Sequence, residues 1–179
     1  MKPRFFSLGE VAAAVGIPRP TLFAWAQKGY LPFLDEGRAA GEDRRFDQDE
    51  VAYTAALSFV AERTGGVSAA LGIMEKARYG GGMWNKALEI AKSAQLLDDE
   101  GCLLVRQHVW KGVSEVDVRW NFYHGELGSQ VTLLMEEPVE GAFVNEAGEE
   151  VSSQPDPLCS VTVYPICKAI SRAFGLLPG

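Results

Sequence analysis

The sequence predicts an α+β fold, in which a helical N-terminal part precedes a small α+β domain with an antiparallel sheet. Two observations support this prediction. Apolar residues in the first 63 positions recur at helical spacing between capping residues, whereas residues 115–125 alternate apolar and polar side chains, as half-buried antiparallel strands do. A chain of 179 residues can hold one domain or two small ones, and we divide it into 1–63 and 64–179.

The first helix is predicted from Ser7 to Gly16. Ser7 and Glu10 have the spacing of a capping box, in which each side chain accepts a hydrogen bond from the other residue's free amide. Gly16 can adopt the left-handed conformation that ends a helix. The apolar residues at helical spacing between them are Leu8, Val11, Ala12 and Val15.

A second short helix is predicted to begin at two prolines. Pro18 and Pro20 lack an amide hydrogen, so they are tolerated only around the first turn of a helix. Gly29 ends the helix about ten residues later. The inward face consists of Leu22, Trp25 and Ala26. Two short helices joined by the tight Gly16-Ile17 turn predict a helix-turn-helix.

A third helix is predicted to begin after Asp47, because Asp47 and Glu50 repeat the capping box and an apolar face follows. The segment between the second and third helices, "FLDEGRAAGEDRRF", is rich in glycine and charge. We expect it to form a hairpin wing, so that residues 1–63 make a winged helix-turn-helix.

The second part of the chain predicts two more helices, a sheet and a closing helix. The helices are expected over about 68–78 and 83–96. The expected strands are "CLLVRQHVW", "EVDVRWNFYHG" and "QVTLLMEE". "SVTVYPICKAISRAFGLL" predicts a strand that passes through Pro165 into the closing helix. A long connection over 140–158 contains a turn at Asn145 to Gly148.

Composition and charge narrow the possible classes of protein. Three cysteines without CxxC spacing argue against a disulfide framework and a zinc ribbon, and predict reduced, buried thiols. No secretory signal or membrane-spanning run is recognisable, so a cytoplasmic location is expected. The net charge of −7 counts against nucleic-acid binding, but residues 1–34 carry four basic side chains against one acidic. An anionic partner would therefore meet the N-terminal end.

Residues 5–60 resemble the winged helix-turn-helix of the mercury-resistance regulator (MerR) type. The resemblance rests on "FSLGEVAAAVGIPRPTLFAWAQKGYLP" followed by "EDRRFDQDEV", and its first stretch has no gap. It includes the Ser-Leu-Gly-Glu-Val start, Trp25, the Gly29-Tyr30-Leu31-Pro32 end and the Arg44-Arg45-Phe46 end of the wing.

The resemblance implies binding of double-stranded DNA, with the second helix in the major groove and the wing on the backbone or in the minor groove. It places Arg19 at the start of the recognition helix and matches Arg44 to the wing arginine that grips phosphate. The DNA-binding residues expected on this basis are Arg19, Thr21, Phe23, Lys28, Arg44 and Arg45. The alternative is that the charged ones are solvated or paired with Glu42 and Asp43.

The chain departs from the family pattern in two ways. Phe23-Ala24 stands where many members carry Arg-Tyr, and Pro20 stands where an arginine is often found. Residues 64–179 do not follow the family at all, because glycines at 65–66 and 80–82 interrupt the long dimerisation helix of its typical members.

No other motif predicts a catalytic or cofactor site, so we expect no enzyme, no metal and no cofactor. Cys102, His108 and His124 fit no metal-ligand spacing, and Glu136, Glu137 and Glu140 have the pattern of solvated carboxylates. The aromatic set Trp110, Trp120, Phe122 and Tyr123 is compatible with a ligand pocket or with core and dimer interface, and we favour dimerisation.

The main hypothesis is a transcriptional regulator whose C-terminal domain dimerises or binds a protein partner or small-molecule effector. One alternative is a phage-type DNA-packaging or recombination adaptor, similar to small terminase subunits and excisionases. Another is a protein-interaction module whose helix-turn-helix has lost DNA binding, for which Pro20, Phe23 and the acidic net charge are the evidence.

Overall fold

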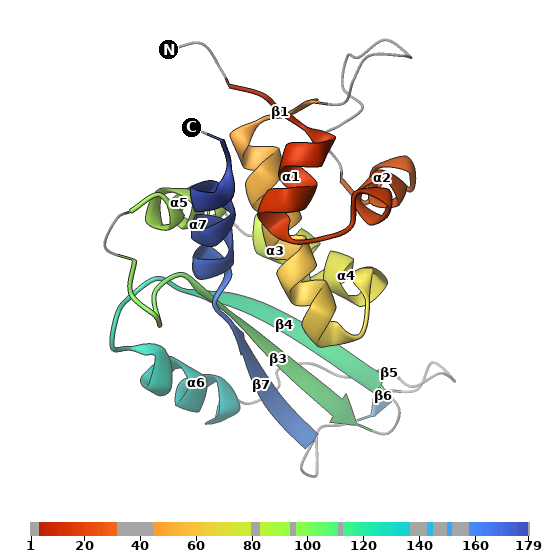
Figure 1. Cartoon of the computed structure of the whole chain (residues 1–179). Coiled ribbons are helices and arrows are strands. Elements are labelled where there is room, and N and C mark those ends of the chain that lie inside the picture. The colour runs from red at the N-terminus through yellow and green to blue at the C-terminus, as the bar shows by residue number, and fades with distance from the viewer. Residues whose placement is uncertain are drawn as a thin grey trace.

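The computed structural model describes residues 4–31, 45–79, 83–93, 96–110, 113–136, 143–144, 150–151 and 158–178. It has the predicted α+β architecture (Figure 1). In chain order the elements are β1 (Phe6–Ser7), α1 (Leu8–Val15), α2 (Arg19–Gln27), β2 (Arg45–Phe46), α3 (Gln48–Thr64), α4 (Val67–Tyr79), α5 (Met83–Ala91), β3 (Cys102–Trp110), β4 (Val113–Asn121), α6 (Leu127–Glu136), β5 (Phe143–Val144), β6 (Glu150–Val151), β7 (Leu158–Tyr164) and α7 (Ile166–Leu176).

The first three helices begin and end at the predicted signals. Both capping boxes are present, Ser7 with Glu10 and Asp47 with Glu50. The free amide and hydroxyl of Ser7 hold the pKa of the Glu10 carboxyl below its usual value, the backbone hydrogen bond being the larger cause. Gly16 has φ 80°, and its N–H donates to the carbonyl of Ala12, which closes α1.

Three antiparallel strands form the main sheet, in the order β4-β3-β7. Its register places Leu103 opposite both Trp120 and Tyr164, so these three side chains share one face. All the described helices except α6 lie on that side of the sheet, and α6 lies on the other (Figure 1). The sheet is therefore the middle layer between a thick helical layer and a single helix.

The helix α7 brings the C-terminal end of the described chain next to the N-terminal end. It packs against α1, α3 and α5, with Ile166 and Ile170 fully buried. The guanidinium of Arg4 donates to the carbonyl of Pro178, so the described ends of the chain are adjacent. One hydrophobic cluster contains residues from both sides of the predicted boundary at 63, including Leu22, Val51 and Ile170.

The segment 130–137 is not the predicted strand; most of it lies in α6. Hydrogen bonds at helical spacing join Gln130 to Glu126 and Thr132 to Gly128. Leu134 faces the sheet and is buried, whereas Leu133 and Met135 are exposed. A short apolar run has no clear period, so the sequence pattern could not separate a strand from a helix here.

Two further boundaries differ from the prediction. The helix expected over 83–96 ends at Ala91 in α5. The strand expected over 115–125 ends at Asn121 in β4, where the Asn121 side chain donates to the carbonyls of Asp99 and Tyr123 and holds a turn. Most of the predicted wing, and the Asn145–Gly148 turn, also lie outside the described residues.

Candidate nucleic-acid interface

The candidate interface is the outward side of α2 together with β2. The helix α2 is held against the core by Leu22 and Ala26, both buried, while Trp25 is half-buried. Its first turn forms when the N–H of Thr21 donates to the carbonyl of Pro18 at 2.9 Å. The prolines thus fix where the helix begins, and the buried side chains fix which side faces solvent.

Three of the predicted residues on this helix and its end are exposed. Arg19 is the first residue of α2, Phe23 keeps 46 % of its surface exposed, and Lys28 caps the end of the helix. The Lys28 ammonium lies 5.8 Å from the centre of the Tyr30 ring, a weak cation–π contact at the surface. Thr21 is half-buried.

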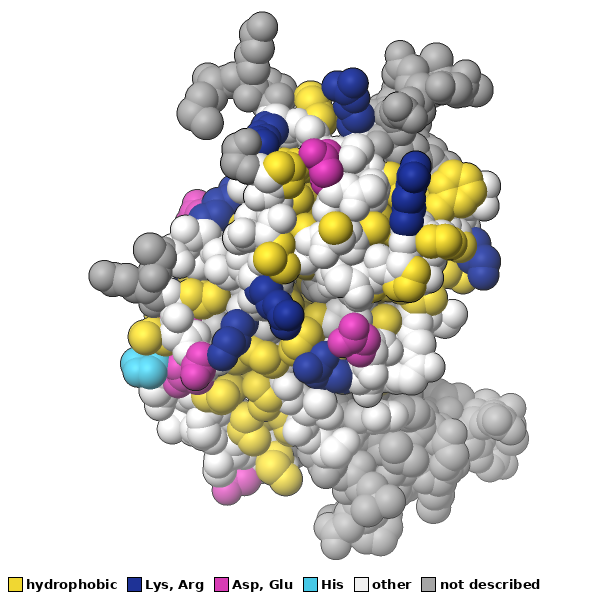
Figure 2. Space-filling view, in the orientation of Figure 1, with side chains coloured by type: hydrophobic (Ala, Val, Ile, Leu, Met, Phe, Trp, Pro, Cys, Tyr) yellow, Lys and Arg dark blue, Asp and Glu magenta, His cyan; other side chains and the backbone are white. Residues whose placement is uncertain are grey.

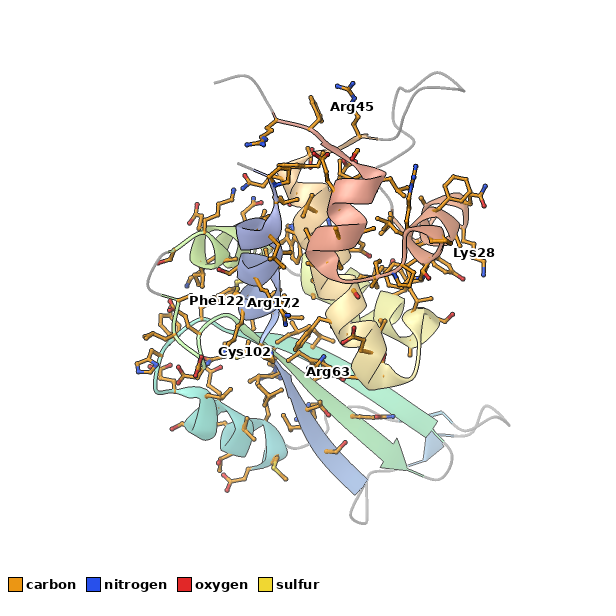
Figure 3. All side chains as sticks on the ribbon, viewed as in Figure 1. Lys28, Arg45, Arg63, Cys102, Phe122 and Arg172 are labelled. Atoms are coloured by element: carbon orange, nitrogen blue, oxygen red, sulfur yellow. The ribbon has the colours of Figure 1, made fainter. Side chains whose placement is uncertain are left out.

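Arg45 reaches the same half of the molecule from β2. Its strand pairs with β1, with Ser7 opposite Arg45, and the Arg45 side chain is exposed. Figure 3 shows Arg45 projecting at the top of the molecule and Lys28 projecting from its right side, both in the half that lies away from the main sheet. Arg44 lies outside the described residues.

The electrostatics of this surface differ from those of the whole chain. No acidic residue occurs between Glu10 and Asp35, a stretch that contains all of α2, although the net charge is −7. The surface of α2 therefore has a local positive charge from Arg19 and Lys28 that no neighbouring carboxylate in its own sequence offsets.

Of the metal-ligand candidates in the sequence, the structure describes the side chains of His124 and Cys102, and that of His108 lies outside the described set. His124 pairs with the Asp99 carboxylate, which also accepts from the Gly125 N–H at 2.7 Å. These hydrogen bonds, Gly125 first and His124 second, lower the pKa of Asp99. Cys102 is buried and unbonded to another cysteine, as Cys167 is. Across the described part of the chain, no three potential metal ligands gather in one place.

Two of the four candidate aromatic residues lie against the core. The rings of Trp120 and Phe122 stack with centres 5.3 Å apart, and Trp84 meets Trp120 edge-on at 6.4 Å. The Trp120 indole N–H donates to the carbonyl of Ala77, so Trp120 joins the sheet to α4. Tyr123 is exposed. Glu136 ends α6 in solvent, and the side chain of Trp110 is outside the described set, as are Glu137 and Glu140.

The structure adds a second group of basic side chains on α7 and α3 that no sequence motif indicated. Lys168 and Arg172 are four residues apart in α7, a helix without an acidic residue, and Arg63 lies near the end of α3. The four-residue spacing of Lys168 and Arg172, in a helix without carboxylates, is the sequence signal that could have identified these two residues.

Comparison of the chain with models of known protein families finds no match, and comparison with curated protein sequences finds none either. Within the described residues, no helix is both long and apolar enough to cross a membrane.

Proposed function

We propose that this protein is a cytoplasmic, MerR-like transcriptional regulator that binds double-stranded DNA through a winged helix-turn-helix formed by α1, α2 and the segment ending in β2. The observation that carries the proposal is the outward side of α2. It exposes Arg19, Phe23 and Lys28 in a stretch of chain free of carboxylates, inside a protein of net charge −7.

Each predicted residue has a role that follows from its chemistry. Arg19 and Thr21, in the first turn of α2, are suited to base edges and to the nearby phosphates, which the helix N-terminus also attracts. Phe23 is suited to the methyl group of thymine. Lys28, Arg45 and Arg44 neutralise backbone phosphates and so position the helix without reading sequence.

A homodimer is part of the proposal. One short recognition helix and one wing make few contacts, and helix-turn-helix proteins double them by binding two half-sites with two-fold symmetry. The C-terminal part supplies the dimer contacts, or a site for an effector or a protein partner.

The test is fluorescence anisotropy of labelled duplex DNA, both random-sequence and from the region upstream of the protein's own coding sequence, over a salt series. We expect affinity that falls steeply with salt, because phosphate contacts release counterions. Arg45→Ala should weaken binding uniformly across sequences and reduce the salt slope by about one. Arg19→Ala should weaken it and also reduce the preference for the upstream duplex.

Lys92→Ala is the matched control, because Lys92 is an exposed cation just after α5, away from α2. An equal loss in Lys92→Ala and Arg45→Ala would mean that only total charge matters. Absence of any salt-sensitive binding at low salt would overturn the proposal.

The exposed ring of Phe23 supports one other function, a protein-interaction module that uses the same surface. A half-exposed phenylalanine on a short helix is a typical anchor for a partner protein. If the protein is such an interaction module, Phe23→Ala abolishes capture of the partner protein, and the unmodified protein does not bind duplex DNA. Retention of a large ATPase or recombinase, together with DNA binding, would instead support the packaging or recombination alternative.

A further inference from the structure

A groove of about 470 Å³ lies between α1, α3 and α7. Its volume is in the range of sites that hold small organic ligands, about 300–1,000 Å³. Its apolar floor consists of several alanine side chains and the Phe59 ring, and because the alanines are short, the three helices enclose the groove without filling it. The lining includes Ala14, Ala55, Phe59, Ala169, Arg172 and Leu176.

The charge at the edge of this groove is positive. Arg172 is exposed and forms no hydrogen bond or ion pair with any residue that the structure describes. Lys168 also lines the groove and pairs with Asp98 at 2.6 Å, but both side chains are more than half exposed, so this pair is weak. Figure 2 shows basic side chains gathered over α3 and α7 in the middle of this face.

Among the described residues that line the groove, Glu62 is the one with a carboxylate. Glu62 lies 3.7 Å from the guanidinium of Arg63, which in turn stacks on the Phe59 ring at 3.5 Å and donates to the Phe59 carbonyl at 3.0 Å. Arg63 from α3 and Arg172 from α7 lie on the same side of the molecule (Figure 3). Because its side chains are exposed, the Glu62–Arg63 pair is weak, as the Lys168–Asp98 pair is. Two cations, Lys168 and Arg172, line the groove against the single carboxylate of Glu62, and this excess of positive charge favours an anion beside Arg172.

We propose that this groove binds a small organic anion with an apolar body, its carboxylate on Arg172 and its hydrocarbon part on the alanine and phenylalanine floor. The planar guanidinium of arginine matches a carboxylate with two parallel hydrogen bonds. Binding is also favoured because the hydrocarbon part of the ligand leaves water for the apolar floor of the groove. An uncharged molecule of the same size gains only this hydrophobic contribution and lacks the charged hydrogen bonds to Arg172.

The groove lies next to the turn between α1 and α2, so a ligand bound in it would touch that turn. Val15 and Gly16, which end α1 and begin the turn to α2, also line it. A ligand here contacts the residues that set the angle between α1 and α2. In that respect the inference deepens the effector part of the proposed function and rests on it, although binding itself requires no DNA.

The test is an NMR titration of the full ¹⁵N-labelled chain, without DNA, with octanoate and with octanamide as its uncharged analogue. We expect octanoate to bind about tenfold more tightly, since a charge-assisted pair is stronger than a neutral hydrogen bond. The largest shifts should be at Gly16 and along α7 around Arg172. Equal affinities for the two compounds, or shifts elsewhere only, would overturn the inference.

Substitutions test whether Arg172 is the cation that binds the carboxylate. Arg172→Ala should lower octanoate affinity about tenfold and leave octanamide affinity unchanged, and Arg172→Glu should lower octanoate affinity further. Lys92→Ala, which removes an exposed cation that does not line the groove, should bind octanoate as the unmodified protein does. Equal octanoate affinity for Arg172→Ala and Lys92→Ala would contradict the proposal. If the unmodified protein binds duplex DNA but not octanoate, this inference alone is refuted. If it binds octanoate but not duplex DNA, only the proposed regulator is refuted.

Discussion

Gly101 occupies a position with no room for a side chain. It has φ +65°, and a Cβ added there would lie 2.1 Å from the Sγ of Cys167. Gly16 has a similar backbone conformation, φ +80°, but open space around it. Alanine substitutions at the two glycines therefore distinguish the loss of stability caused by a left-handed backbone from the loss caused by a steric clash.

Gly16→Ala should lower the free energy of unfolding by about 1 kcal/mol, the usual cost of placing a Cβ in the left-handed region. Gly101→Ala should lower it by about 3 kcal/mol or more, because overpacking at the Cys167 sulfur adds to the same backbone cost. Urea unfolding of the two variants measures the difference. Equal losses would mean that Cys167 moves aside at no cost.

The thiols of Cys102 and Cys167 should be unreactive while the protein is folded. Burial is the first cause in both, and it raises the pKa of Cys102 to about 11 and that of Cys167 to about 12, from 9.0. Because the neutral form is favoured in the fold, the associated stability is present below pH 9 and is lost as the pH rises toward these values.

Labelling with a thiol reagent at pH 8 measures this reactivity, in a Cys159→Ser variant that leaves only the two described thiols. We expect no labelling in the native protein and two labelled thiols in urea. Rapid labelling of the native protein would show that one of the two sites opens readily.

At the scale of elements, the capping boxes determine where α1 and α3 begin. In α3 the Asp47 carboxylate accepts from the Glu50 N–H at 2.9 Å, and the Glu50 carboxylate accepts from the Asp47 N–H at 2.7 Å. Side-chain signals of this kind act within four residues, which is why the sequence alone predicts them.

Asp47→Ala should lower the free energy of unfolding by about 1 kcal/mol, because the N–H of Glu50 loses its side-chain acceptor. Asp47→Ser should retain most of the stability. Gln48→Ala, at the exposed first residue of α3, is the control and should change little. Thermal or urea unfolding measures all three, and identical curves for Asp47→Ala and Gln48→Ala would contradict the role of the cap.

For the whole molecule, α7 is the element that ties the sheet to the helical layer. Ile170 is fully buried in a cluster that also contains Val11 of α1 and Leu103 of β3. The predicted boundary at residue 63 remains a prediction, and this shared cluster provides a way to test it.

Ile170→Ala should lower the free energy of unfolding by about 2–5 kcal/mol, as large-to-small changes in a core do. If the chain unfolds as one unit, hydrogen exchange should show protection falling together in α1 and in β3. Leu133→Ala, at an exposed position on α6, is the control and should leave both elements protected. Loss of protection in β3 with α1 unchanged would instead support two independently folding parts.

The sequence by itself determined the features that depend on neighbours along the chain. These include the starts and ends of α1, α2 and α3, the presence of strand β4, the strand-to-helix passage at Pro165, and which face of α2 carries Arg19, Phe23 and Lys28. Caps, prolines and periodicity act over a few residues, so their signals can be recognised without a fold.

Only the tertiary structure decided the features that depend on residues far apart. Burial of Leu134 against the sheet made α6 a helix although its apolar run also fits a strand. Packing of α7 across α1 and α3 created the groove and brought Arg172 and Glu62 into its lining. These contacts join residues distant in the sequence, those of α7 with α1 and α3 being about one hundred positions apart or more, and they follow from burying apolar surface in three dimensions, which no local spacing records.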